Sequence, residues 1–278
     1  MLVEDVKGYV ENFAAFGIPV EYKGLKIKPI VAEDATAFLR AVEVFRIEKN
    51  KIPNVDIIRM SYLEFMLSLL IHQEDFSDFL WILEKTLDIS FDAKLCKEGW
   101  EDHPDEILME ELPNGDAFYY INGRDLEMKL RHRGGAEITI KGVHFTSSEF
   151  DDFRSIILFQ NIYDYDDMVL SDDVRRVVEQ YYALKNKGIH HPTMEDKTVA
   201  NILNTSYTQE MLRKVPYRTF EKMFHDGVSE VDYIATKSLE PHLKEGHSID
   251  HWIYKPIREK YSEVFKDAGE LARKITSI

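Results

Sequence analysis

Three histidines late in the chain, His242, His247 and His251, are the residues whose spacing best suits a metal ion. Zinc requires three or four such ligands that converge, usually with a general base nearby. The chain has no His-Glu-x-x-His motif, and Gly246 favours a loop before His247 over a helix. We therefore interpret these histidines and Asp250 as polar loop residues, and the sequence predicts no metal site and no cofactor.

Motifs for nucleophilic or nucleotide-dependent catalysis are absent from the sequence. It contains no Gly-x-Ser-x-Gly elbow, no P-loop and no Gly-x-Gly-x-x-Gly turn. The single cysteine, Cys96, lies in an acidic segment without an evident partner, which favours a free thiol over a nucleophile. The sequence therefore predicts that the protein is not an enzyme. A metal-dependent hydrolase, whose histidines and carboxylates meet only in the folded chain, is one alternative.

The segment 199–224 resembles a helix-turn-helix. A helix ending near Leu203, a turn at 204–207 and a helix from Thr208 fit this pattern. Four cations could face DNA phosphates, and four acids nearly cancel them: Arg213, Lys214, Arg218 and Lys222, against Glu195, Asp196, Glu210 and Glu221. A DNA-binding regulator is therefore the other alternative function.

Composition narrows the class of protein further. With 278 residues, of which 44% are hydrophobic, the chain can build one large domain or two smaller ones. Its formal charge of -15 argues against a broad face for nucleic acid or membrane lipid. One cysteine excludes an internal disulfide. Since no signal-peptide layout and no apolar run of roughly 20 residues is found, we expect a soluble intracellular protein.

Three turn signals divide the chain, at residues 113–116, 122–123 and 134–135. Their Asn-Gly and Gly-Gly pairs tolerate the positive φ angles of tight hairpins. We therefore predict an α+β fold with an N-terminal hairpin plus helices, a central antiparallel β-meander and a C-terminal helical bundle. We place the domain boundary near residue 146, which gives an α+β domain 1–146 and a helical domain 147–278.

Local patterns predict individual elements in the first half. A short hairpin is expected around Lys23-Gly24, and a helix is expected over 35–45 with Asp34 near its cap. Further helices are expected at 56–72 and 74–88, followed by an alternating strand at 87–95. The four predicted strands of the meander are 107–112, 117–121, 124–133 and 136–145.

Helix-capping signals predict the second half. Thr146 and Glu149 form a capping-box pattern, and Thr193 and Thr208 are expected to open two short helices. A third helix, starting after Pro216, is expected to stop at Gly227. A last amphipathic helix is expected over 257–275.

Four aromatic residues form the surface that we expect to contact a partner, because aromatic side chains anchor protein interfaces. They are Tyr217, Phe220, Trp252 and Tyr254. Core packing is the alternative interpretation of Trp252 and Tyr254.

Four stretches resemble proteins encoded in the tail modules of contractile-tailed bacteriophages of Gram-positive hosts: 16–30, 51–62, 149–161 and 249–254. The order of an N-terminal hairpin, a helix and a later Thr-capped helical pair is similar to baseplate hub assembly proteins. The resemblance implies a structural or chaperone-like role in building a phage tail, with tail or baseplate proteins as partners. It implies a location in the host cytoplasm during assembly, or in the virion tail. Neither a membrane nor nucleic acid is expected as a partner.

Overall fold

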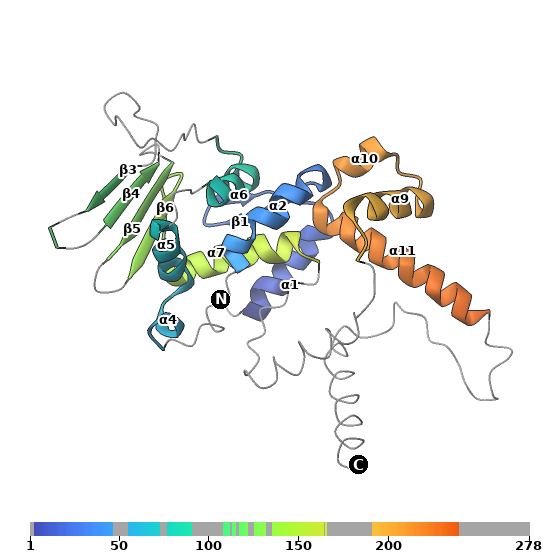
Figure 1. Ribbon diagram of the computed structural model, residues 1–278, viewed down its shortest axis with the longest axis horizontal. Helices are drawn as coiled ribbons and strands as arrows, with labels where there is room; N and C mark the ends of the chain where they lie inside the picture. Colours follow the sequence, from blue (N-terminus) through green and yellow to red (C-terminus); the bar gives the residue numbers. More distant parts are fainter. Residues whose placement is uncertain are drawn as a thin grey trace, which may run out of the picture. The chain divides into compact units, whose positions relative to one another are not determined.

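The computed structural model divides the chain into two compact units, each built from two stretches of sequence (Figure 1). Unit 1 comprises Met1–Asp166 and Glu210–Phe220, and unit 2 comprises Asp167–Gln209 and Glu221–Ile278. Helices and two small antiparallel sheets are both present, so the predicted α+β class is confirmed. The residues that the structure describes are 3–46, 55–72, 77–90, 108–111, 113–114, 117–121, 125–131, 135–163, 165 and 191–238.

Unit 1 begins with helix α1 (Val3–Ala14), which ends in a glycine cap. The N–H of Gly17 donates to Ala14 O at 3.2 Å and that of Ile18 to Phe13 O at 3.0 Å. These two bonds are those of a Schellman motif, in which the residue at the Gly17 position adopts positive φ. Gly17 has φ +65, and a Cβ built on it would lie 2.7 Å from Cγ of Pro216. Both the cap and the approach of Pro216 therefore require glycine.

The predicted hairpin is present as β1 (Val20–Tyr22) and β2 (Leu25–Ile27). Tyr22 pairs with Leu25, so that only Lys23 and Gly24 form the loop. Their φ angles of 51 and 82 suit a two-residue turn of type I′.

Two predicted helices are each broken into shorter ones. The segment 35–45 forms α2 (Ala35–Ala41) and most of α3 (Glu43–Arg46), and the short 3-10 helix η1 (Ala32–Asp34) precedes them. The side chain of Asp34 does not cap α2. Its carboxylate instead accepts a hydrogen bond from Lys85 Nζ at 3.0 Å. The segment 56–72 forms α4 (Val55–Arg59) and α5 (Tyr62–His72), because Ser61 and Glu64 exchange capping hydrogen bonds between them.

Helix α6 (Ser77–Leu87) is buried along much of its length. Leu87, the predicted start of a strand, is its last helical residue, and Asp88 follows with φ 56. A left-handed residue at this position ends a helix instead of opening a strand. The predicted strand at 87–95 is therefore wrong at its start, and its residues 91–95 lie outside the described part of the chain.

The described strands of the meander are β3 (Leu108–Glu111), β4 (Ala117–Ile121), β5 (Leu126–Leu130), β6 (Ala136–Ile140) and β7 (Val143–Phe145). Each pairs antiparallel with the next in sequence. The predicted strand 136–145 is two strands, because Lys141 and Gly142 turn the chain at φ 51 and 75. Leu126, Met128, Ile138 and Ile140 are buried on one face, and β6 packs against α5 and α7 (Figure 1).

Helix α7 (Ser147–Asn161) lies at the centre of unit 1. Thr146 and Glu149 form the predicted capping box at its start. The helix packs against α1, α3, α5, β6 and β7, and the rings of Phe150 and Phe153 lie 5.8 Å apart in the core. The domain boundary predicted at residue 146 therefore falls inside unit 1. The capping box marks the start of helix α7. This helix packs back onto the preceding strands, so its first residue does not begin a new domain.

Residues 28–32 run from the end of β2 into the start of η1, and Ile30 and Ala32 are buried among them. The backbone N–H of Ile30 donates to Asn161 Oδ1 at 2.7 Å, and its carbonyl accepts from Tyr217 N at 2.7 Å. Two further N–H groups of the segment are bonded: Lys28 N to Thr86 O at 2.6 Å, and Ala32 N to Val215 O at 2.8 Å. The segment therefore joins α6, α7 and the returning residues 215–217.

Unit 2 contains α9 (Met194–Asn204) and the larger part of α11 (Tyr217–Lys237), whereas α10 (Gln209–Arg213) falls mainly in unit 1. Thr193 opens α9, as predicted, and the structure shows that it forms a capping box with Asp196. Gly227 does not end α11: a Cβ on it would lie 2.7 Å from Nδ2 of Asn204, so glycine here allows α9 to approach α11. No helix in the described part of the chain is long and apolar enough to cross a membrane. The predicted helix at 257–275 lies outside the described residues.

Replacing Gly17 by alanine should lower the free energy of unfolding by at least about 2 kcal/mol, because a side chain there is strained and meets Pro216. Gly8 is the matched control. It lies inside α1 with nothing within 4 Å of a built Cβ, so Gly8→Ala should stabilise the protein by about 0.5–1 kcal/mol. Urea unfolding followed by circular dichroism compares the two. Equal effects would contradict the assigned cap.

Asn161→Ala should lower the free energy of unfolding by about 2–3 kcal/mol, because it leaves the buried N–H of Ile30 without its acceptor. Hydrogen exchange at the Ile30 amide should accelerate in the same variant. Asn12→Ala is the control, since Asn12 donates to Gly8 O on the exposed side of α1 and its loss should cost no more than about 0.5 kcal/mol. Unchanged protection of the Ile30 amide would refute the role of Asn161.

Candidate functional site

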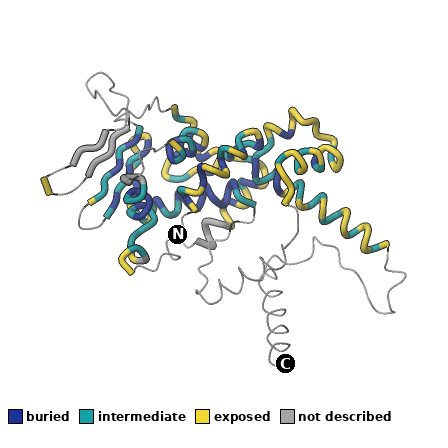
Figure 2. Tube along the Cα trace, in the orientation of Figure 1, coloured by how far each residue is buried: buried dark blue, intermediate teal, exposed yellow. Residues whose placement is uncertain are grey.

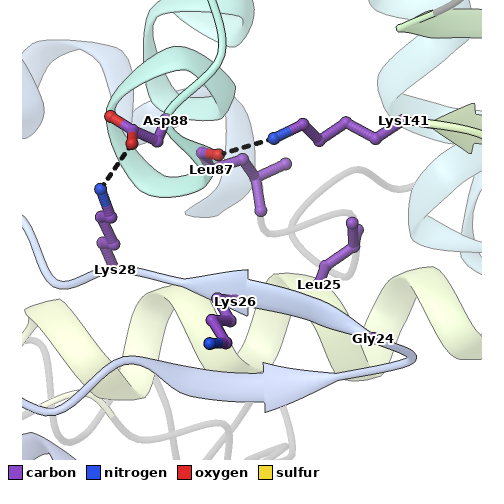
Figure 3. Close-up of a pocket in the computed structure, with 7 residues that line it drawn as sticks. All are labelled: Gly24, Leu25, Lys26, Lys28, Leu87, Asp88 and Lys141. Atoms are coloured by element: carbon purple, nitrogen blue, oxygen red, sulfur yellow. Dashed lines mark hydrogen bonds and ion pairs between the residues drawn. The ribbon is translucent and has the colours of Figure 1, made fainter.

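A groove in unit 1 lies between β2 and the C-terminal end of α6 (Figure 3). Its volume is about 440 Å³, which is within the range of small ligand sites. We call it the lysine groove, and its lining residues are Gly24, Leu25, Lys26, Lys28, Leu87, Asp88 and Lys141. The charged residues of this lining, as described, are thus three lysines and one aspartate, on a chain whose net charge is -15.

Two of these lysines reach the end of α6 from opposite sides (Figure 3). Lys28 Nζ lies 2.7 Å from Asp88 Oδ2, and Lys141 Nζ donates to Leu87 O at 3.3 Å. The hydrogen bond and charge of Lys28 lower the pKa of Asp88. Cations at a helix C-terminus are favourable because the last carbonyls carry partial negative charge. Lys28 and Lys141 therefore have a structural role at this helix end, and Leu25 and Leu87 supply a buried apolar floor.

Lys26 differs from both, since it has no side-chain partner among the described residues. It is exposed and pairs with Glu21 across the hairpin. A two-residue hairpin loop is closed by a hydrogen-bonded pair, so the next pair, Glu21 and Lys26, is of the non-hydrogen-bonded kind. The backbone N–H and C=O of Lys26 consequently point away from β1, towards the groove.

The hairpin turn is fastened to the rest of unit 1 by Lys23. Its Nζ donates to His144 O at 2.7 Å and lies 2.7 Å from Glu149 Oε1. The hydrogen bond from Lys23, together with those from the N–H and hydroxyl of Thr146, lowers the pKa of Glu149 to about 2. Beside it, burial and the charge of Asp152 raise the pKa of Tyr22, whose hydroxyl donates to Asp152 Oδ2 at 3.1 Å. These contacts hold β1 and β2 against β7 and α7.

A second candidate is a set of exposed apolar side chains in unit 2. Figure 2 colours much of α9 and α11 as exposed. On α11, Val228, Val231 and Ile234 recur every third residue, and the latter two are 54% and 59% exposed. We call these three residues the α11 stripe. Helix α9 of the same unit also exposes apolar side chains: Val199, Ile202 and Leu203. Contiguous exposed apolar side chains mark surfaces that contact other proteins.

Two of the four aromatic residues predicted to contact a partner are in the core. Tyr217 and Phe220 are only 5% and 1% exposed, and the ring of Tyr217 lies 6.0 Å from that of Phe38. The expectation that these two rings form a surface is therefore corrected: they are apolar residues on the inner face of the first turn of α11. Trp252 and Tyr254 lie outside the described residues.

Three of the four cations expected to face DNA phosphates have protein partners. Arg213 lies 3.5 Å from Glu33, and Lys222 lies 2.6 Å from Asp226. Arg218 donates to the carbonyls of Phe159 and Ile162 and lies 3.6 Å from Glu11. These contacts occupy the groups that a helix-turn-helix would use on phosphate, so we do not propose DNA binding by this segment.

The residues considered for metal or nucleophilic chemistry lie elsewhere. His242, His247, His251 and Cys96 are outside the part of the chain that the structure describes. Within that part, no three His, Cys, Asp or Glu side chains gather so that they could hold a metal ion.

Comparison with protein-family models, curated proteins and solved structures finds no match for this chain. We therefore base the proposed function on the two surfaces and on the four stretches of sequence resemblance. The lysine groove was not predicted from sequence. A signal for it exists in Lys23, Lys26 and Lys28, three lysines within six residues of an acidic chain, but Lys141 and the end of α6 join them only in the fold.

Glu149→Gln should lower the free energy of unfolding by about 1 kcal/mol at pH 6, an amount that allows for the partial exposure of the carboxylate. Glutamine keeps the capping position, so the change removes the charge alone. The native pKa of about 2 lies below the ordinary 4.5, so the stabilisation is present above pH 4.5 and is lost as the pH falls towards 2.

Urea unfolding of both proteins between pH 6 and pH 2 measures this difference, which should shrink as the pH falls. Glu210→Gln, which removes one exposed carboxylate from α10, is the control and should change stability by less than about 0.5 kcal/mol throughout. A difference that does not depend on pH would mean that the Lys23–Glu149 pair is not its source.

Proposed function

We propose that this chain is a non-enzymatic structural or assembly protein of a contractile bacteriophage tail or baseplate, which acts through contacts with other tail proteins. The observation that carries the protein-contact part is the α11 stripe of Val228, Val231 and Ile234. The tail assignment is supported by the four stretches of sequence resemblance.

The α11 stripe suits recognition of one protein by another. Fully burying a valine or isoleucine side chain contributes about 1.5–3 kcal/mol, so three of them offer a substantial part of a binding free energy. Apolar residues three or four apart along one helix are the pattern by which a helix docks into an apolar groove. Acidic residues flank the stripe along the helix, at Glu230 and Asp232, and would form the polar rim typical of an interface.

Such a protein works either as a part of the finished tail or as a chaperone that leaves before completion. Both need a partner-binding surface, and neither needs a cofactor. Their difference lies in where the chain is found: a component is retained in purified virions, whereas a chaperone is found only with assembly intermediates in the host cytoplasm.

The double substitution Val231→Asp and Ile234→Asp should reduce recovery of tail or baseplate proteins by about tenfold or more, because two charges would be buried in the interface. A tagged chain is expressed during infection by the phage that encodes it, and co-purified tail proteins are quantified by mass spectrometry. Thr236→Asp is the matched control, since Thr236 is exposed on the opposite side of α11 and its change should leave recovery unaltered.

Circular dichroism establishes that the variants remain folded. If the unchanged chain recovers no tail or baseplate protein, the proposed function is wrong. If the double variant recovers the same proteins in the same amount, the α11 stripe is not the contact surface. Detection of the chain in purified virions assigns it as a component, and its absence there assigns it as a chaperone.

A further inference from the structure

The outer edge of β2 has backbone groups that can accept another strand. Lys26 directs its N–H and C=O away from β1, and no partner for either group lies among the described residues. Two residues further along, the N–H of Lys28 donates a hydrogen bond to Thr86 O at 2.6 Å, so this N–H is not open to another strand. The open part of the edge is therefore short and centred on Lys26.

Lysines outnumber carboxylates in the described lining beside this open edge, and Glu21 lies opposite Lys26 on β1. Lys26 contributes an exposed ammonium group, while Lys28 and Lys141 border the groove on the side of α6. Among the described lining residues, Asp88 carries the carboxylate, and one of its oxygens forms an ion pair with Lys28. The buried side chains of Leu25 and Leu87 lie between the edge and the helix end (Figure 3).

We propose that the lysine groove binds an extended acidic segment of a partner protein, which adds as a strand to β2 at Lys26. Its backbone exchanges hydrogen bonds with the N–H and C=O of Lys26, in the way that peptides extend exposed sheet edges. Carboxylates on one face of the segment meet the ammonium groups, and a small apolar side chain contacts Leu25 and Leu87. This inference goes beyond the proposed function, because it concerns a different surface and defines the chemistry of the partner.

A peptide fits this site better than a nucleic acid does. A strand edge presents one donor and one acceptor at the spacing of a polypeptide backbone, which phosphodiester chains do not match. The net charge of -15 also repels a polyanion over the rest of the surface, whereas a short acidic segment meets only the local lysines.

The test uses the full chain and a fluorescein-labelled peptide of about eight residues in which glutamate and valine alternate. Fluorescence anisotropy at low salt should show binding that weakens as salt is added. Lys26→Gln combined with Lys141→Gln should weaken that binding by about tenfold or more, since glutamine keeps the size and hydrogen-bonding capacity of the side chain but removes its charge. Lys129→Gln with Lys214→Gln removes two charges elsewhere in unit 1 and should leave affinity unchanged.

Strand addition has its own readout. The peptide should slow hydrogen exchange at the Lys26 amide, and a version with N-methylated backbone positions should bind more weakly because it cannot donate hydrogen bonds. The Val231→Asp and Ile234→Asp variant should bind the peptide normally, so a failure of the α11 stripe and a failure of the groove are distinguishable.

Three results would overturn the proposal. One is no binding of the acidic peptide at low salt. Another is equal binding by the Lys26→Gln and Lys141→Gln variant. The third is capture of single-stranded oligothymidylate or inorganic polyphosphate as tightly as the peptide, which would identify a general anion surface.

Discussion

Unit 1 depends on the hydrogen bonding of one segment, residues 28–32. Buried backbone N–H and C=O groups must be bonded, since an unpaired buried group is costly. Here the partners come from the end of α6, from Asn161 on α7 and from the returning residues 215–217. The segment therefore fixes the positions of elements that are far apart in sequence. The lysine groove follows from the same segment, because Lys28 bonds to Thr86 through its backbone and to Asp88 through its side chain.

The two candidate surfaces use different physical interactions. The lysine groove combines a strand edge with local positive charge, so it favours orientation and charge matching of a partner. The α11 stripe is apolar and gains its affinity from area removed from water, which is less directional. The first belongs to unit 1 and the second to unit 2. A protein with both kinds of surface can bind two partners of different chemistry.

Sequence reasoning succeeded where a signal acts over a few residues. The Lys23-Gly24 turn, the capping box at Thr146 and the helix start at Thr193 are all present. It failed where the outcome depends on residues distant in sequence. Tyr217 is of a residue type that is common at interfaces, but its ring packs against that of Phe38 in the core. The boundary at residue 146 was misplaced because a strong helix start reports local capping and carries no information about packing. The groove could not be predicted, since its lysines and the end of α6 are neighbours only after folding.

The return of residues 210–220 to unit 1 has a consequence for synthesis on the ribosome. Val215 and Tyr217 supply hydrogen bonds to Ala32 and Ile30, so the interior of unit 1 stays incomplete while the nascent chain is shorter than about 217 residues. Closure must wait until the intervening part of unit 2 has left the exit tunnel. Unit 1 is thus completed only after the first stretch of unit 2 has been synthesised, and early termination products cannot complete its interior.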